Sequence, residues 1–125
     1  EKKIFFQGML ERNILHEKLQ SFDIAIVPLK TRIYGSVPSK IFEYGALGFP
    51  VLYFGGGEGE TIVKENNLGW IAQVRNFESL NTALIEISNT GKEPIQIIKQ
   101  KVFDYAESHF NLDFQIKNLI NKGCF

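Results

Sequence analysis

The pattern of apolar and polar positions alternates between short β-type runs and longer helical runs. Apolar runs predict strands over 3–8, 23–29, 50–54 and 69–74. The run over 23–29 is nearly continuous, which is typical of a strand buried on both faces, so we expect it at the centre of the sheet. Alternation of this kind predicts βαβ units, and hence an α/β fold whose parallel sheet of about four strands is flanked by helices.

Apolar residues at helical spacing fill the segments between and after these runs. They predict helices over 13–22, 38–47, 60–67, 77–88 and 95–109, and a last helix after Asn111. Pro38 suits the first turn of the second helix, Gly48 its end, and Asn76 can cap the fourth. The last helix is expected to turn three residues inward, Ile116, Leu119 and Ile120. Because no repeat or low-complexity linker divides the chain, residues 1–125 are expected to form one domain.

Composition narrows the classes of protein to which the chain can belong. Hydrophobic residues make up 44% and charged residues 22%, which favours a globular protein over a disordered one. Lys plus Arg (14) equals Asp plus Glu (14) and no basic stripe exists, so nucleic acid is not expected as a partner. The single Cys124 cannot form an internal disulfide, and no His/Cys cluster suits a metal. We therefore expect a cytoplasmic protein without a metal site.

Several motifs are better explained by structure than by chemistry. The glycine-rich stretch over 55–60 has Glu60 where a dinucleotide fingerprint needs its third glycine, and it lacks the Lys of a P-loop. We interpret it as a flexible turn that positions the next helix. His16 and His109 have no catalytic partner at a recognisable spacing, and Trp70 at the head of a strand is expected in the core.

The segment SVPSKIFEYGALGFPV, over 36–51, places one acid inside a helix that begins after a central strand. The backbone N–H groups at the start of that helix, with Lys40, favour an anion such as phosphate. The helix start is also expected at the carboxyl end of the strand over 23–29, where ligands of open α/β sheets bind. Glu43 can then accept hydrogen bonds from the vicinal hydroxyls of a ribose. The alternative is a surface acid paired with Lys40, three residues before it.

These residues resemble a known family. FDIAIVPLK, SKIFEYGALGFPVL and GGGEGETIVKENNLGWIAQVRNFESLNTALIEI together resemble the C-terminal domain of GT-B type, retaining glycosyltransferases of family 4, in the lipopolysaccharide and capsule branch. The resemblance covers nearly the whole chain and follows the order of the family's motifs. It implies a Rossmann-like sheet and an enzyme that moves a sugar from a nucleotide-sugar donor to a glycan or lipid-linked precursor, without metal or other cofactor.

The resemblance also assigns site residues. Two Glu residues separated by seven others mark the family's donor site, and Glu43 matches the second, which binds the ribose. The first, which touches the donor sugar, falls at position 35, where this chain has Gly35, and the glycine usual three residues later is Pro38. These departures resemble a sub-branch that reads PSK-x-FEY. We hypothesise that the remaining polar contacts to the donor come from Ser36, Ser39 and Lys40.

Family members are roughly three times as long, with the acceptor-binding domain and the diphosphate-gripping basic residues on the N-terminal side. The resemblance therefore implies that this chain is a fragment, inactive alone, of an enzyme acting at the inner face of the membrane. The family's strand order leaves a gap between the strands over 3–8 and 23–29. Either the first strand moves in beside the second, or open edges pair between copies in a swapped or edge-to-edge homodimer, which we favour.

Two rival functions remain open. A sugar-nucleotide epimerase shares the same fold, and its acid and base residues would lie in the part that this chain does not contain. A non-catalytic α/β module that binds nucleotide or protein is the second rival, and Gly35 in place of the usual acid favours it. In the family, the contacts that select the donor base, the donor sugar and the acceptor lie mostly upstream.

Overall fold

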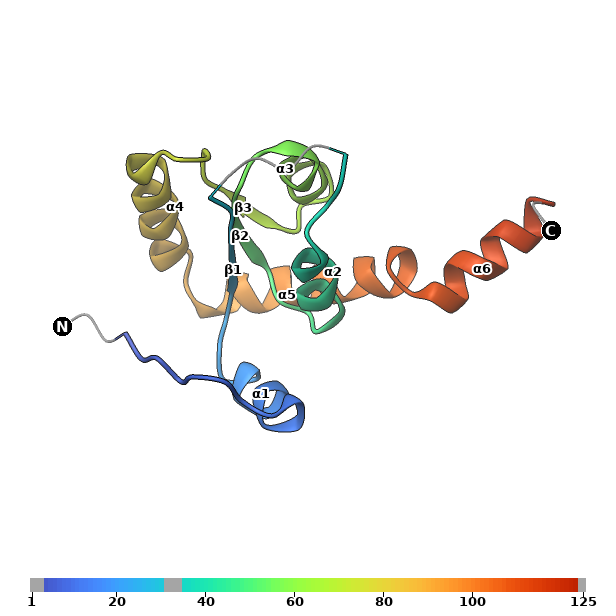
Figure 1. Ribbon diagram of the computed structural model, residues 1–125, viewed down its shortest axis with the longest axis horizontal. Helices are drawn as coiled ribbons and strands as arrows, with labels where there is room; N and C mark the ends of the chain where they lie inside the picture. Colours follow the sequence, from blue (N-terminus) through green and yellow to red (C-terminus); the bar gives the residue numbers. More distant parts are fainter. Residues whose placement is uncertain (1–3, 31–34, 124–125) are drawn as a thin grey trace.

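The computed structural model describes residues 4–30 and 35–123 and shows an α/β arrangement (Figure 1). Three parallel strands in the described residues form one sheet in the order β1-β2-β3. The elements in chain order are α1 (Arg12–Leu19), β1 (Ala25–Pro28), α2 (Ser39–Ala46), β2 (Val51–Phe54), α3 (Gly57–Glu65), β3 (Gly69–Ile71), α4 (Phe77–Thr90), α5 (Lys92–His109) and α6 (Leu112–Asn121). The predicted α/β class with a helix-flanked parallel sheet is confirmed, with three strands described instead of four.

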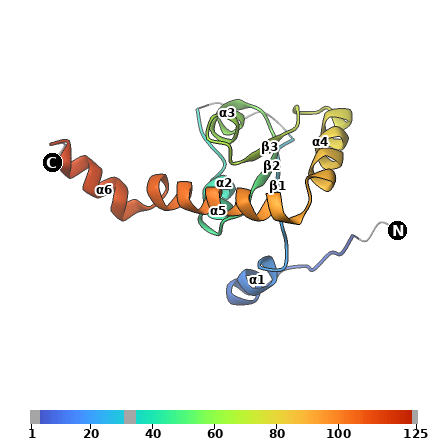
Figure 2. The same cartoon turned by 180° about the vertical axis from the view of Figure 1, so that it is seen from behind.

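Helices cover the two faces of the sheet unequally (Figures 1 and 2). α2, α3 and α5 lie on one face, where a core of seven buried residues forms: Val27, Ile41, Val51, Tyr53, Val63, Leu68 and Val102. α4 lies on the other face, and its residues Ala83 and Ile87 pack with Leu52 and Phe54 of β2. β2 is therefore enclosed from both sides, which is the environment that parallel sheets require.

The central strand is β2, so the expectation that the run over 23–29 is central is wrong for the described sheet. Val51, Leu52 and Tyr53 are each at most 1% exposed, whereas Ile26 of β1 is 47% exposed. β1 has a neighbouring strand on one side only, and α4 does not cover Ile26. A continuous apolar run indicates that both faces of a strand can be buried. Whether both faces of β1 are buried depends on the sheet topology. Pro28, which lacks an N–H group, suits this edge strand.

The strand predicted over 3–8 does not form over residues 4–8, and residue 3 lies outside the described part. Ile4, Phe5 and Phe6 are 75%, 72% and 95% exposed, and this segment runs away from the sheet (Figure 1). A strand is held by hydrogen bonds to a neighbour and by packing of its faces, and this segment has neither. The rearrangement in which it moves in beside β1 is thus not what the structure shows, and pairing between copies stays a prediction.

The glycine-rich stretch over 55–60 is mostly helical, which corrects its interpretation as a flexible turn. α3 begins at Gly57 instead of residue 60, after the N-cap Gly56, and both glycines have positive φ values. The Tyr53 hydroxyl donates a hydrogen bond of 2.9 Å to the carbonyl of Gly56. A Cβ atom at Gly59 would lie 2.5 Å from that hydroxyl oxygen. The glycines therefore make room for a core tyrosine, which supports a structural role over a phosphate cradle.

The ends of the other helices follow the sequence in part. Asn76 caps α4 as predicted, since its Oδ1 accepts a hydrogen bond of 3.0 Å from the Ser79 N–H. Gly48 follows α2 at a φ of 75°, as expected for a glycine past a helix end. Pro38 is the N-cap of α2 instead of its first residue, and no side chain caps that helix.

The last helix, α6, extends beyond the body of the molecule (Figures 1 and 2). Ile116, Leu119 and Ile120 are 40%, 42% and 55% exposed, so the prediction that they face inward is wrong. Their spacing marks one face of a helix, but α6 continues past the sheet and finds no described element to cover that face. Periodicity identifies an amphipathic helix without supplying its partner.

Candidate functional site

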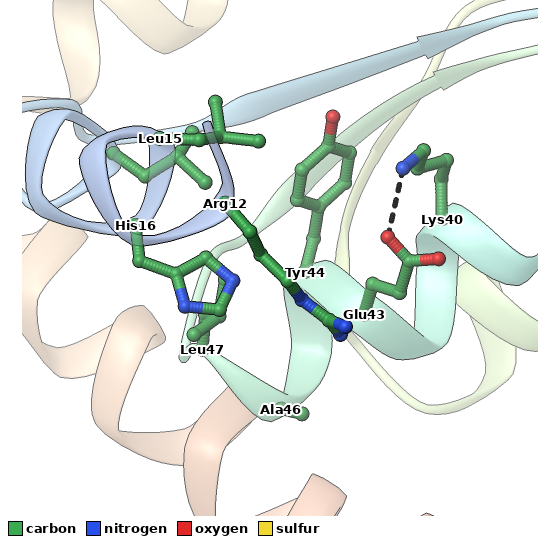
Figure 3. Close-up of a pocket in the computed structure, with 9 residues that line it drawn as sticks. Arg12, Leu15, His16, Lys40, Glu43, Tyr44, Ala46 and Leu47 are labelled. Atoms are coloured by element: carbon green, nitrogen blue, oxygen red, sulfur yellow. Dashed lines mark hydrogen bonds and ion pairs between the residues drawn. The ribbon is translucent and has the colours of Figure 1, made fainter. Parts of the chain in front are cut away.

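A cavity of about 610 Å³ lies between α1 and α2, and two of the predicted binding residues line it (Figure 3). Lys40 and Glu43 project from α2, Arg12 extends toward Glu43 from α1, and His16 of α1 lies beside Leu47. The rest of the lining is mainly apolar: Leu15, Leu19, Tyr44, Ala46 and Leu47. A concave apolar surface with a few converging polar groups is the usual composition of a small-molecule site.

The amphipathic pattern of α2 sets the direction of Glu43. Ile41 is fully buried in the core under the helix, and Gly45 faces α5 and the residues after it. A Cβ atom at Gly45 would lie 3.0 Å from the ring of Phe110, so the helix can pack this closely only with glycine there. Because this face is fixed against the core, Lys40 and Glu43 are turned outward to the cavity.

Lys40 and Glu43 form an ion pair, with 2.8 Å between Nζ and Oε2 (Figure 3). Their side chains are 57% and 53% exposed, so the pair contributes little to stability. The hydrogen bond from Lys40 lowers the pKa of the Glu43 carboxyl, and the charges of Lys40 and Arg12 lower it further. The pair matches the surface-acid interpretation of Glu43. It also holds the carboxylate in its ionised form, which only accepts hydrogen bonds, to lower pH than an unpaired Glu.

We expect the Glu43 carboxyl to titrate with a midpoint below its ordinary value of 4.5, as carbon-13 NMR of the side chain would show. Since folding lowers this pKa, the small contribution of the pair is present above pH 4.5 and is lost as pH falls through the folded value. Lys40→Met removes the main cause and is expected to raise the midpoint toward 4.5. Lys64→Met, on α3, is the control, and an unchanged Glu43 midpoint in Lys40→Met would contradict the assignment.

Three other predicted residues, Gly35, Ser36 and Ser39, lie outside the lining of the cavity. Ser39, the first residue of α2, contributes a side-chain hydrogen bond that lowers the pKa of Glu43, so it belongs with the pair. Ser36 is exposed in the loop before α2. Gly35, at a φ of 72°, donates its N–H to Oε1 of Glu58 over 3.1 Å. The carboxylate of Glu58, on α3, therefore lies beside Gly35, which has no side chain of its own.

Arg12 and His16 were missed as site residues by the sequence interpretation, which treated His16 as structural or solvated. Both line the cavity, and α1 buries none of its residues. The available signal was their spacing of four, which with Leu15 and Leu19 puts them on one helical face. The sequence does not show that this face of α1 lies opposite α2, and only that arrangement makes its residues part of the cavity.

The remaining candidates have structural explanations. The His109 ring stacks on Tyr105 with 4.0 Å between centroids, and its Nδ1 lies 3.0 Å from the Tyr105 carbonyl oxygen. Trp70 is partly buried and packs against the core cluster that contains Leu52. No group of three or more His, Cys, Asp or Glu residues is placed to hold a metal among residues 4–30 and 35–123. Cys124 lies outside the described residues.

None of the helices in the described part of the chain combines the length and apolar character needed to cross a membrane. No protein-family model matches the chain, and comparisons with curated proteins and with solved structures return no match. Function is therefore inferred from the residues of the chain and their geometry.

Proposed function

We propose that this chain is the nucleotide-sugar-binding part of a glycosyltransferase that builds a surface polysaccharide or lipopolysaccharide, and that Glu43 accepts the hydroxyls of the donor ribose. The observation that carries the proposal is the position of Glu43, an ionised carboxylate at the rim of a cavity of about 610 Å³. Ligand cavities commonly measure about 300–1,000 Å³, so the space suits a nucleotide-sized molecule.

Two features of the structure support a donor site on this chain. The parallel sheet with helices on both faces is a scaffold that commonly binds nucleotides. A carboxylate also lies beside position 35 although the residue there has no side chain, because Glu58 of α3 accepts a hydrogen bond from the Gly35 N–H. The two positions of the family's donor motif are thus both acidic in this structure. Glu43 supplies its own carboxylate, and Glu58 supplies one beside Gly35.

The chemistry assigned to the chain is electrostatic. Transfer with retention builds positive charge on the donor sugar and negative charge on the departing nucleoside diphosphate, and fixed cations stabilise the latter. Lys40 is a cation on the rim of the cavity, where it forms an exposed ion pair with Glu43. When the donor binds, its hydroxyl groups contact Glu43 and its phosphate groups contact Lys40, in place of the contact that the two side chains make with each other.

A non-catalytic nucleotide-binding module is the second candidate, and Gly35 favours it. A Cβ atom added at Gly35 would meet no atom of the described residues within 4 Å, and this is the position where the family places a sugar-binding side chain. The two candidates differ in what the sugar contributes. A donor site is expected to separate UDP-glucose, UDP-galactose and UDP by affinity, whereas a nucleotide-binding module binds the three equally.

Isothermal titration of the chain with UDP, GDP and their sugars tests the proposal. Glu43→Gln keeps the size of the side chain but removes its charge, and the loss of charged hydrogen bonds is expected to weaken binding by about tenfold to a hundredfold. Glu86→Gln is the matched control, because Glu86 is exposed on α4 over the opposite face of the sheet. Equal affinities for wild type and Glu43→Gln, or no binding of any of these ligands, would overturn the ribose assignment.

A further inference from the structure

The cavity between α1 and α2 carries more positive than negative charge. Of the residues that line it, Arg12 and Lys40 are permanent cations and Glu43 is an anion. Lys40 is already engaged, since its Nζ donates to Glu43 at 2.8 Å. Arg12 is therefore the cation of the lining that forms no ion pair with a described residue, although its charge also acts on Glu43.

Arg12 reaches across the cavity from the other helix. Figure 3 shows its side chain extending from α1 toward Glu43 and Tyr44, and its charge is near enough to lower the pKa of Glu43. The guanidinium is a planar fork of five N–H donors that matches phosphate oxygens two at a time. Glu43 offers acceptors only, so it suits hydroxyl groups and repels phosphate. The rim thus presents a phosphate-binding group and a hydroxyl-binding group from facing helices.

α1 has little else to hold it. None of its residues is buried, and Ile14 and Leu15 are 41% and 40% exposed. A helix that buries so little apolar surface gains little from packing. A ligand held by Arg12 on one side and by Glu43 on the other would bridge α1 to α2 and add the contacts that α1 lacks.

We propose that Arg12 is a phosphate contact that this chain contributes to the cavity: its guanidinium binds the diphosphate of a nucleoside diphosphate whose ribose hydroxyls bind Glu43, in addition to the basic residues that the resemblance places upstream. This assignment rests on the proposed function, since it uses the same ligand and the same cavity. It adds a binding residue from an element outside the sheet, and it makes the order of α1 depend on the ligand. His16, one turn further along α1, lines the same side and offers a ring nitrogen to the ligand.

The test compares ligands with and without phosphate on the whole chain. Isothermal titration with UDP, GDP, uridine, guanosine and inorganic pyrophosphate is carried out on wild type and Arg12→Gln. Loss of the charged bidentate contact is expected to weaken UDP, GDP and pyrophosphate by about tenfold to a hundredfold, and to leave uridine and guanosine unchanged. Lys18→Gln is the matched control, because Lys18 lies on α1 but contacts Gln7 instead of the cavity.

Amide hydrogen exchange gives a second readout. UDP is expected to slow exchange in residues 12–19 of wild type, and pyrophosphate to do so less, since it lacks the ribose that reaches Glu43. Both substitutions are at exposed positions, and circular dichroism is expected to show an unchanged fold.

The outcomes separate this inference from the proposed function. In one outcome, Glu43→Gln weakens UDP binding, but Arg12→Gln weakens it no more than Lys18→Gln does. This result overturns the role of Arg12 and is consistent with the ribose site. In another outcome, Arg12→Gln weakens pyrophosphate binding, but Glu43→Gln leaves UDP binding unchanged. This result supports Arg12 as the anion contact and overturns Glu43 as the ribose contact. Absence of binding by UDP, GDP and pyrophosphate overturns both.

Discussion

Gly69→Ala is expected to unfold the sheet or to lower the free energy of unfolding by about 3 kcal/mol or more. Gly69 begins β3 at a φ of 150° and lies directly opposite Val51 of the central strand. A Cβ atom there would overlap the Val51 carbonyl oxygen and lie 2.5 Å from its nitrogen. Backbone cannot move aside as a flexible side chain can, so the β2–β3 pairing must separate. Urea unfolding followed by circular dichroism measures the loss.

Gly35→Ala is the matched control for this prediction. Gly35 also has a positive φ, of 72°, but an added Cβ atom would meet no atom within 4 Å in the described part of the chain. Only the backbone preference remains, and it costs about 1–2 kcal/mol. If Gly69→Ala were no more destabilising than Gly35→Ala, the close approach of β3 to Val51 would be wrong.

Leu52→Ala is expected to lower the free energy of unfolding by about 2–5 kcal/mol, because it leaves a cavity in the middle of the core. Leu52 is fully buried on the central strand and packs with Phe54, Ala72 and Ala83. A domain of this size is commonly stable by about 5–15 kcal/mol, so this one change removes a large part of the total. The midpoint of urea unfolding is expected to fall without a change in slope.

Ile26→Ala tests the position of β1 at the sheet edge. Ile26 is the register partner of Leu52 and shares its face, but it is 47% exposed. Its truncation is expected to cost about 1 kcal/mol, since the apolar area it buries is roughly half as large. Equal losses for the two substitutions would show that the face over β1 is covered in solution, and would contradict the edge position.

The local structure of this chain was largely predictable, and particular residues show why. Asn76 caps α4 and Gly48 ends α2 because capping and positive φ depend on one residue and its close neighbours. The strands over 25–28, 51–54 and 69–71 lie within predicted runs. The start of α3 differs from the prediction, and the small residues Gly55 and Gly59 are required there by contact with Tyr53, which the local pattern does not show.

Two of the nine described residues that line the cavity, Lys40 and Glu43, are among the five binding residues that the sequence predicts. Lys40 and Glu43 were found because they lie on one short helix and their spacing of three makes them neighbours. Arg12 and His16 belong to a helix more than twenty residues earlier, and nothing local relates them to Glu43. The meeting of Gly35 with Glu58 is likewise a contact between a loop and the start of α3.

The sequence by itself determined the α/β class and most helix and strand positions, since each follows from spacing along the backbone, and it left open whether Glu43 is paired with Lys40 or free for a ligand. Only the tertiary structure decided that β2 is central, that the segment over 4–8 stays unpaired, and that Arg12 faces Glu43 across a cavity. Such features depend on which elements lie side by side. A one-dimensional pattern states what a strand or helix can bury, and the neighbours available in space determine what it does bury.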